Sequence, residues 1–493
     1  ISQIPPGSFD VLGGLTYPHR ANSAAYENTS HLVSPRVGFA WSPDKLGGKT
    51  IVRTGFGLFV SPTTIAYLAQ NGNYSSNPII DQEGFSQQTS MTPSTDNYLT
   101  PAATFSDPFP GGAILRPNAA AVGQTTFLGQ TVSFLNPKAK SAYSLRWNFG
   151  FQQSLSPTMF LEVVYIGNHS VHLPINLTQI NGIPRQYLST LPVRDNALIN
   201  ALNATVPNPF NGIVTSGTPA GSTTSVAQLL SFYPEFPLGY TSGAWSGSGG
   251  VLEQNLNVGS SYFHSLNVQL VRRFSKGTTI IGNYVFSKLM EEDTWLNDTD
   301  PRPEKRIGVF DHSHRGTIAV IYDLPFGRGK QFSVRSRWAD MLVGGWHLTG
   351  IYTLQTGQPF TWMGTSSTTI GDLVYNGDKL RFNPRDTNGP AFNISAFDRN
   401  TADQFAYHIR TFSTTFSSLR GDATNELNAS MLKQFDITAD QKRYFQLRFE
   451  SFNVMNRPTF AFPNLAPTNS GFGLITAQSN RSRSIQVGAR LVF

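Results

Sequence analysis

The feature that most constrains the fold is an alternation of apolar and polar residues that recurs in segments of about ten residues. In one such segment, Phe445, Leu447 and Phe449 alternate with polar neighbours. The same alternation occurs at 145–152, 161–165, 266–270 and 485–493. A period of two is the spacing of a β-strand with one apolar and one polar face. The sequence therefore predicts an all-β protein.

The lengths of the connections distinguish a soluble sandwich from a membrane barrel. The predicted hairpins have short links, at 43–49, 155–158, 275–277 and 439–442. Between the hairpins lie long segments rich in Gly, Pro, Asn and Ser, at 62–141, 174–260, 361–422 and 458–483. A compact soluble domain rarely tolerates several such loops, whereas an outer-membrane barrel combines short periplasmic turns with long extracellular loops. With a strand near 9–16 and a longer inner link at 327–344, the pattern predicts an antiparallel transmembrane β-barrel of about twelve strands.

Composition agrees with this fold and excludes several others. Only 14% of the 493 residues are charged and 12% are aromatic, which disfavours a helical bundle. The absence of Cys excludes disulfides and cysteine-ligated metals. The net charge is +7 without a basic block, so we expect no nucleic-acid partner. The chain starts without Met or a signal-peptide pattern, and we expect a processed or truncated start.

The alternation assigns side chains to two surfaces of the barrel. In an outer-membrane barrel the apolar face contacts lipid and the polar face lines the lumen. We expect the lipid-facing residues to include Leu145, Trp147, Phe149, Phe445, Leu447 and Phe449. The lumen-lining candidates are Arg53, Arg146, Arg448, Glu450 and Arg490. An Arg at 447 should cost about 2–4 kcal/mol if that position lies near the bilayer midplane.

Several motifs resemble those of Oar-like TonB-dependent receptors, which are outer-membrane barrels abundant in Acidobacteria. The resemblance runs nearly from end to end but leaves out the long loops. It rests on SPRVGFA at 34–40, KTIVRTGFG at 49–57, WNFGFQ at 147–152, EVVYIG at 162–167, YVFSK at 284–288, HRG at 314–316, DLPFG at 323–327, GGW at 344–346, LQTGQPF at 354–360, RFESFNVMN at 448–456 and the terminal strand.

This resemblance implies a 22-stranded barrel, of which the chain resembles the C-terminal half. The family also has an N-terminal plug, often a small β-sandwich, and a TonB box, and none of these is recognisable here. We therefore expect residues 1–493 to be one barrel domain without them, and contact with the TonB complex to be made by a missing N-terminal region. The expected location is the outer membrane of a Gram-negative bacterium, where lipid and lipopolysaccharide are further partners.

The terminal strand resembles the signal that is read by the barrel-assembly machinery. Its residues are Ile485, Val487, Ala489, Leu491 and Phe493. The alternative is an ordinary amphipathic strand.

Two polar clusters contain residue types that bind metal ions, but neither has the spacing of a known metal site. His312 and His314 are two residues apart and lack an evident third ligand. A second cluster is dense in carboxylates, and its weak Ca²⁺ candidates are Glu291, Glu292, Asp293, Asp298 and Asp300. The alternative is a solvated extracellular loop, and we expect no cofactor or specific metal.

Clustered aromatic residues in the outer loops are candidates for stacking on sugars or peptides. They are Phe232, Tyr233, Phe236, Tyr240 and Trp245, with Phe105, Phe109 and Phe127 in the preceding loop. The alternative is that these loops pack on themselves. No motif of a hydrolase, phosphate loop or metalloprotease occurs, so we expect no enzyme.

The combined interpretation is an outer-membrane receptor that imports a bulky nutrient, an oligosaccharide or a peptide, through a plugged barrel. Only the barrel and the long outer loops follow from the residues, and the energised uptake follows from the resemblance. The alternative is a structural or adhesive surface barrel that transports nothing.

Overall fold

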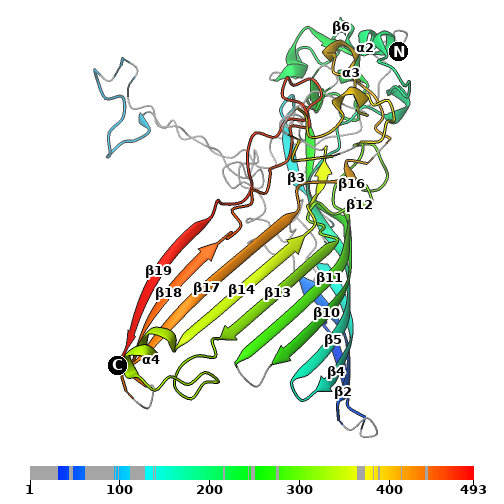
Figure 1. The fold of residues 1–493 in the computed structure, drawn as a ribbon. Helices are drawn as coiled ribbons and strands as arrows, with labels where there is room; N and C mark the ends of the chain where they lie inside the picture. Colours follow the sequence, from blue (N-terminus) through cyan, green and yellow to red (C-terminus); the bar gives the residue numbers. More distant parts are fainter. Residues whose placement is uncertain are drawn as a thin grey trace.

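The computed structural model describes residues 32–43, 48–61, 94, 96–97, 99–110, 128–136, 138, 140–214, 217–241, 244–245, 250–273, 277–362, 372–380, 382–386, 389–411, 413–438 and 442–493. One large sheet of tilted strands dominates it, and the strands lie side by side in chain order (Figure 1). Along the sheet they are β1 (Arg36–Trp41), β2 (Thr50–Ser61), β4 (Ala142–Ser156), β5 (Met159–Gln179), β10 (Val251–Arg273), β11 (Thr278–Glu292), β13 (His314–Asp323), β14 (Trp346–Gln355), β17 (Thr424–Asp436), β18 (Tyr444–Phe452) and β19 (Ser484–Val492). All neighbours on this path are antiparallel, which confirms the predicted fold class.

Shorter elements accompany the sheet. Strand β3 (Val132–Leu135) runs parallel to the start of β10, and β12 (Arg306–Ile307) pairs with β11. Three small pairs form separately: β6 (Thr205–Pro207) with β7 (Thr223–Ser225), β8 (Tyr240–Thr241) with β9 (Ala244–Trp245), and β15 (Pro359–Thr361) with β16 (Thr415–Arg420). The helices are α2 (Asn196–Asn203), α3 (Val226–Leu229) and α4 (Arg337–Val343), and the 3-10 turns are Arg185–Tyr187, Thr218–Ala220, Ile394–Ala396 and Thr401–Asp403. Among the described residues, none of the helices is long and apolar enough to cross a membrane.

Strands β5 and β10 are longer than the sequence predicted, and both extend into the predicted loop 174–260. The predicted loop covered 174–260, whereas the two strands continue to Gln179 and from Val251. The additional residues pair with one another, with a register irregularity around Gly259. The connection between these strands is therefore shorter than the predicted loop 174–260.

The register of the ladder tests the predicted two-faced sheet directly, because residues opposite each other in an antiparallel pair lie on the same face. One continuous row joins Phe149, Tyr165, Leu266 and Phe286 across four strands. Met431, Phe449 and Val487 form another row on the same face, here called the apolar face. Phe149, Phe286 and Val487 are 55%, 49% and 65% exposed, so protein does not cover them. Such a surface is typical of the lipid contact of an outer-membrane barrel.

The two edges of the sheet are β1 and β19. No pairing joins these two strands within the part of the chain that the structure describes. The predicted strand near 9–16 lies outside the described residues.

Leu447 and Phe449 lie on either side of Arg448, the central residue of β18, and both belong to the apolar face. Leu447 lies opposite Lys433, whose ammonium group donates to the carbonyl of Gly344 in the connection that follows α4. Leu447 is therefore one same-face position nearer the inner end of the sheet than Phe449.

We expect Phe449→Arg to lower the free energy of unfolding by about 2–4 kcal/mol, because it places a charge in the hydrocarbon region, and Leu447→Arg to cost less because the penalty falls towards the interface. Thr353→Arg is the control, since Thr353 lies on the opposite face, across from Glu426. Reversible denaturant unfolding of the full-length protein in phospholipid bilayers measures all three. Equal costs on the two faces would contradict the assignment of the apolar face.

Candidate functional site: the loop cap at the outer end of the sheet

The long outer connections fold together into a compact unit at one end of the sheet, which we call the cap (Figure 1). It consists of the described parts of 180–250, 293–313, 356–423 and 453–483. Its helices form for local reasons: the Asp195 side chain accepts a hydrogen bond from the Leu198 amide at the start of α2, and Ile199 and Leu202 face inward.

The two largest hydrophobic clusters within the described residues hold the cap together. In the first, Leu202 and Val226 from the β5–β10 connection pack with Tyr407 from the β14–β17 connection. In the second, Phe360, Trp362 and Phe397 pack with Leu465 and Phe472 from the β18–β19 connection. Connections that are distant in sequence therefore share a common core, and the cap is built like a small soluble domain.

Hydrogen bonds reinforce the contact between the first two connections. The Ser189 amide donates to the Tyr407 carbonyl at 2.8 Å, and the Ile409 amide donates back to the Ser189 carbonyl at 2.9 Å. The Tyr407 hydroxyl donates to Oδ1 of Asn203 at 2.8 Å. The side chain of Tyr407, in the β14–β17 connection, is thereby fixed against α2 of the β5–β10 connection.

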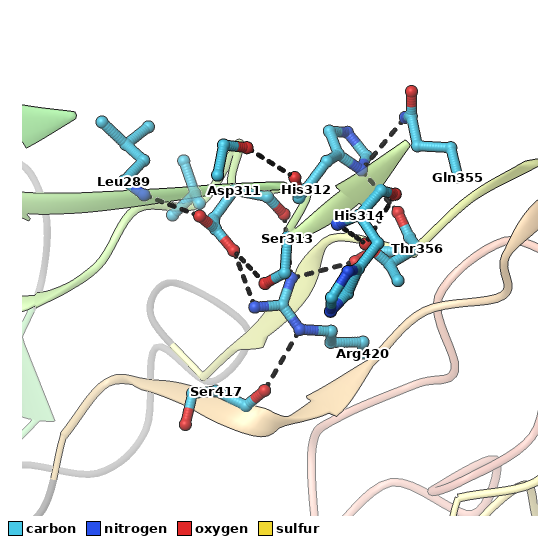
Figure 2. A network of polar contacts seen from close by, with 12 residues as sticks. Leu289, Asp311, His312, Ser313, His314, Gln355, Thr356, Ser417 and Arg420 are labelled. Atoms are coloured by element: carbon cyan, nitrogen blue, oxygen red, sulfur yellow. Dashed lines mark hydrogen bonds and ion pairs between the residues drawn. The ribbon is translucent and has the colours of Figure 1, made fainter. Parts of the chain in front are cut away.

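A buried ion pair lies where the cap meets the sheet (Figure 2). The Asp311 side chain is 1% exposed, and its Oδ2 lies 2.7 Å from Nη2 of Arg420. Its Oδ1 accepts from the Leu289 amide of β11 at 2.7 Å, and the Ser313 hydroxyl donates to Oδ2 at 3.0 Å. Arg420 also donates to the carbonyls of Asp311, Gly357 and Ser417. The pair therefore joins β16, the start of β13 and the outer end of β11.

The carboxylate cluster predicted from the sequence does not converge. Glu292 accepts from the Ser260 hydroxyl at 2.7 Å, Asp293 pairs with Arg306 at 2.9 Å, and Asp300 pairs with Arg185 at 2.8 Å. Glu291 accepts from the Val309 amide, and Asp298 also has an interaction partner. Within the described residues, no three side chains of His, Asp or Glu are arranged to hold a metal ion. The cluster instead connects neighbouring loops.

The two histidines of the other cluster point to different partners. Nδ1 of His312 lies 2.6 Å from the Thr356 carbonyl, while Nδ1 of His314 lies 2.8 Å from the Tyr284 hydroxyl. They do not form a shared site.

All five lumen candidates lie on one face, opposite the apolar face. The register places Arg53, Arg146, Arg448, Glu450 and Arg490 there. Arg448 and Glu450 approach to 3.7 Å, and Arg146 lies over the Phe59 ring at 4.9 Å. That this face lines a lumen and contacts a solute stays a prediction.

The terminal residues Ile485, Val487, Ala489 and Leu491 share the apolar face of β19. Phe493 follows β19 and is 94% exposed. These positions agree with an amphipathic strand, and their role as an assembly signal stays a prediction.

The structure changes the interpretation of the loop aromatics. Phe236 is 1% exposed and packs with Val132 and Val251, so it supports the cap and offers no surface to a solute. The Asn181 amide holds its turn, donating to the carbonyls of Tyr233, Phe236 and Pro237.

Among the other loop candidates, Phe232 and Tyr233 are half-buried, and Tyr240 and Trp245 pair in the β8–β9 hairpin. Phe105 is fully exposed, Phe109 is half-buried, and Phe127 lies outside the described residues.

A pocket that the sequence analysis missed opens in the cap. Its volume is about 730 Å³, and its walls come from 374–376 and 394–399. The two segments are joined by hydrogen bonds, from the Asn376 amide to the Ala396 carbonyl and from the Asp398 amide to the Val374 carbonyl, each at 2.9 Å. Polar side chains of Tyr375, Asn376, Asp398 and Arg399 line it beside the buried Phe397. Burial, with Asp378 nearby, raises the pKa of Tyr375.

Only the length of the loop 361–422 could have pointed to this pocket from the sequence. Its residues show no motif, and the two walls are brought together by the tertiary fold.

We expect Arg420→Met to loosen the attachment of the cap, because removing one partner of a buried ion pair costs about 3–5 kcal/mol. Hydrogen exchange of the full-length protein should become faster in 413–420. The double variant Asp311→Leu with Arg420→Met should recover part of the protection, since it leaves no unpaired buried charge. Unchanged exchange in the single variant would show that the pair does not hold the cap.

Several solved structures are similar to this chain. The outer membrane transporter YddB from Escherichia coli aligns with a TM-score of 0.44 and 9% identity, covering 94% of this chain and 41% of that one. The ferripyoverdine receptor of Pseudomonas aeruginosa aligns with a TM-score of 0.37 and 8% identity, covering 93% and 33%. The toluene transporter TodX of Pseudomonas putida aligns with a TM-score of 0.22 and 10% identity, covering 94% and 75%. The chain thus spans less than half the length of YddB and of the ferripyoverdine receptor.

No curated protein sequence matches the chain. A family described as "Outer membrane beta barrel domain" matches residues 3–486, which is nearly the whole chain. The antiparallel sheet, its exposed apolar face and its one-sided long loops are those of such a barrel. The chain therefore belongs to the outer membrane beta barrel domain family, and its location is the outer membrane of a Gram-negative bacterium.

Proposed function

We propose that the chain is the C-terminal part of the barrel of an Oar-like TonB-dependent receptor, and that the cap recognises the nutrient that this receptor imports. The family membership and the sequence motifs support the receptor class. In this proposal the TonB complex acts through residues outside this chain.

The observation that carries the proposal is the pocket in the cap. Its volume of about 730 Å³ lies within the usual range of about 300–1,000 Å³ for small-molecule sites. It combines an aromatic ring, an amide, a carboxylate and a guanidinium group, from Tyr375, Asn376, Asp398 and Arg399. Flat apolar surface beside several hydrogen-bonding groups suits a sugar ring or a peptide bond.

The attachment of the cap supports a role in recognition. Loops bind a ligand effectively when a rigid scaffold positions them. The Arg399 guanidinium donates to the Pro467 carbonyl at 3.4 Å, so the pocket wall also contacts the β18–β19 connection. A solute bound there would lie at the outer end of the sheet, where it would enter the barrel.

We expect cells that carry the full-length receptor to take up a fluorescent oligosaccharide or a fluorescent heptapeptide in a saturable manner that a protonophore abolishes. Arg399→Gln should weaken the apparent affinity by about tenfold or more, because a lost hydrogen bond to a charged group costs about 1.5–3 kcal/mol. Arg302→Gln is the control, since Arg302 is an exposed arginine of the cap that does not line the pocket.

Uptake that neither saturates nor responds to the protonophore would indicate passive leakage. Cell adhesion without uptake would favour the structural or adhesive surface barrel. Either result would overturn the proposal.

A further inference from the structure

A cluster of basic and aromatic side chains lies at the outer end of the apolar face. His264 of β10 faces Lys288 of β11 in register, and His314 is the first residue of β13. The Tyr165 hydroxyl lies 2.7 Å from Nδ1 of His264, and the Tyr284 hydroxyl lies 2.8 Å from Nδ1 of His314. These five residues are all exposed, and we call them the His–Tyr cluster.

The cluster presents unused hydrogen-bond donors. When the tyrosine proton is donated to Nδ1, the neutral imidazole carries its own proton on Nε2, which points away as a donor. No hydrogen bond to Nε2 of His264 or His314, and no ion pair of Lys288, occurs among the described residues. The carboxylate of Glu292 lies two same-face positions further out and accepts from Ser260. The cluster is therefore a set of donors with a positive charge, open to an anion.

An apolar groove lies next to this cluster on the same face, on the side towards the inner end of the sheet. Its volume is about 370 Å³, and Gly282 and Gly316 form its floor. Its walls are the side chains of Val268, Leu270, Tyr284, Ile318, Tyr352 and Leu354. An added Cβ would have no atom within 4 Å at Gly316, so the missing side chain there leaves open space.

The groove and the cluster are continuous. Tyr284 belongs to both, since its ring lines the groove and its hydroxyl contacts His314. On β13, Gly316 and His314 are successive residues of the same face. An apolar slot that ends in cationic and donor groups at its outer end matches a lipid with an anionic headgroup and an acyl chain.

We propose that this site binds one phosphorylated glycolipid of the outer leaflet, with its phosphate on Lys288, His264 and His314 and an acyl chain in the groove. The charge of the cluster favours a phosphate over a neutral headgroup. The continuity with the lipid-facing surface favours a membrane lipid over a soluble anion. The inference rests on the outer-membrane location and is independent of the proposed transport.

The test measures binding of diphosphoryl lipid A, of a dephosphorylated lipid A and of inorganic phosphate to the purified full-length protein in detergent micelles, by native mass spectrometry and titration. Diphosphoryl lipid A should bind at one saturable site. Lys288→Gln should weaken this binding about tenfold, as expected for the loss of one charge-assisted contact. Gly316→Leu should weaken lipid binding as well, because the added side chain fills the groove.

Two matched variants serve as controls. Lys379→Gln removes a positive charge from an exposed site in the cap, and Gly350→Leu adds a leucine to the apolar face of β14 outside the groove. Both should bind lipid A like the unmodified protein. Heat-resistant migration in gel electrophoresis verifies that each variant is folded.

Three results would overturn the proposal. The first is that Lys288→Gln and Gly316→Leu bind lipid A as tightly as their controls, which would mean that the cluster is only an interfacial belt of aromatic residues. Dephosphorylated lipid A could bind as tightly as the diphosphoryl form. Inorganic phosphate could displace the lipid while Gly316→Leu has no effect, so that the ligand is a soluble anion.

Discussion

The need to pair every backbone amide and carbonyl away from water determines this structure. Hydrocarbon cannot accept or donate hydrogen bonds, so a chain that crosses a bilayer with strands must pair them side by side. The strands from β1 to β19 do this in chain order, each with its sequence neighbour on the sheet. Once the ladder is formed, the side chains are assigned to two faces with a period of two. The exposed Phe149, Phe286 and Val487 on one face and the arginines on the other follow from that single constraint.

At the outer end of the sheet the connections leave the membrane and are surrounded by water. They therefore bury their apolar residues against one another. Phe360, Phe397 and Phe472 are each less than 8% exposed inside the cap, whereas aromatic residues of the sheet are left uncovered. The Asp311–Arg420 pair lies at the boundary between the lipid-facing sheet and the water-exposed cap. The high aromatic content of the sequence therefore has two origins, a lipid-facing surface and a water-excluding core.

The sheet was predictable from the sequence because its signal is local. The alternation around Leu145 and around Phe449 specifies both the strand and the face, and the structure agrees with both. The extensions of β5 and β10 were not predicted, because these residues were assigned to the loop 174–260. For β5 a local signal was present, since Leu173, Ile175 and Leu177 continue the alternation. The cap could not be predicted, because its contacts are not local. The contact of Tyr407 with Asn203 joins residues that are far apart in sequence, and the walls of the pocket meet only after the chain has folded. Phe236 illustrates this limit of prediction from sequence, because the sequence around an aromatic loop residue does not show whether its side chain is buried or exposed to a solute.

The central claim is that one sheet separates lipid from an aqueous interior. Because residues 1–493 contain no Cys, single cysteines introduced at successive positions from 445 to 450 and from 485 to 491 have no competing thiol within this chain. The measurement is the accessibility of a spin label at each position, in the full-length protein in bilayers, to oxygen dissolved in lipid and to a water-soluble nickel complex. The account predicts that odd positions such as 447, 449 and 487 respond to oxygen and that even positions between 445 and 450 respond to nickel. A reversed pattern, or the absence of alternation in both strands, would contradict it.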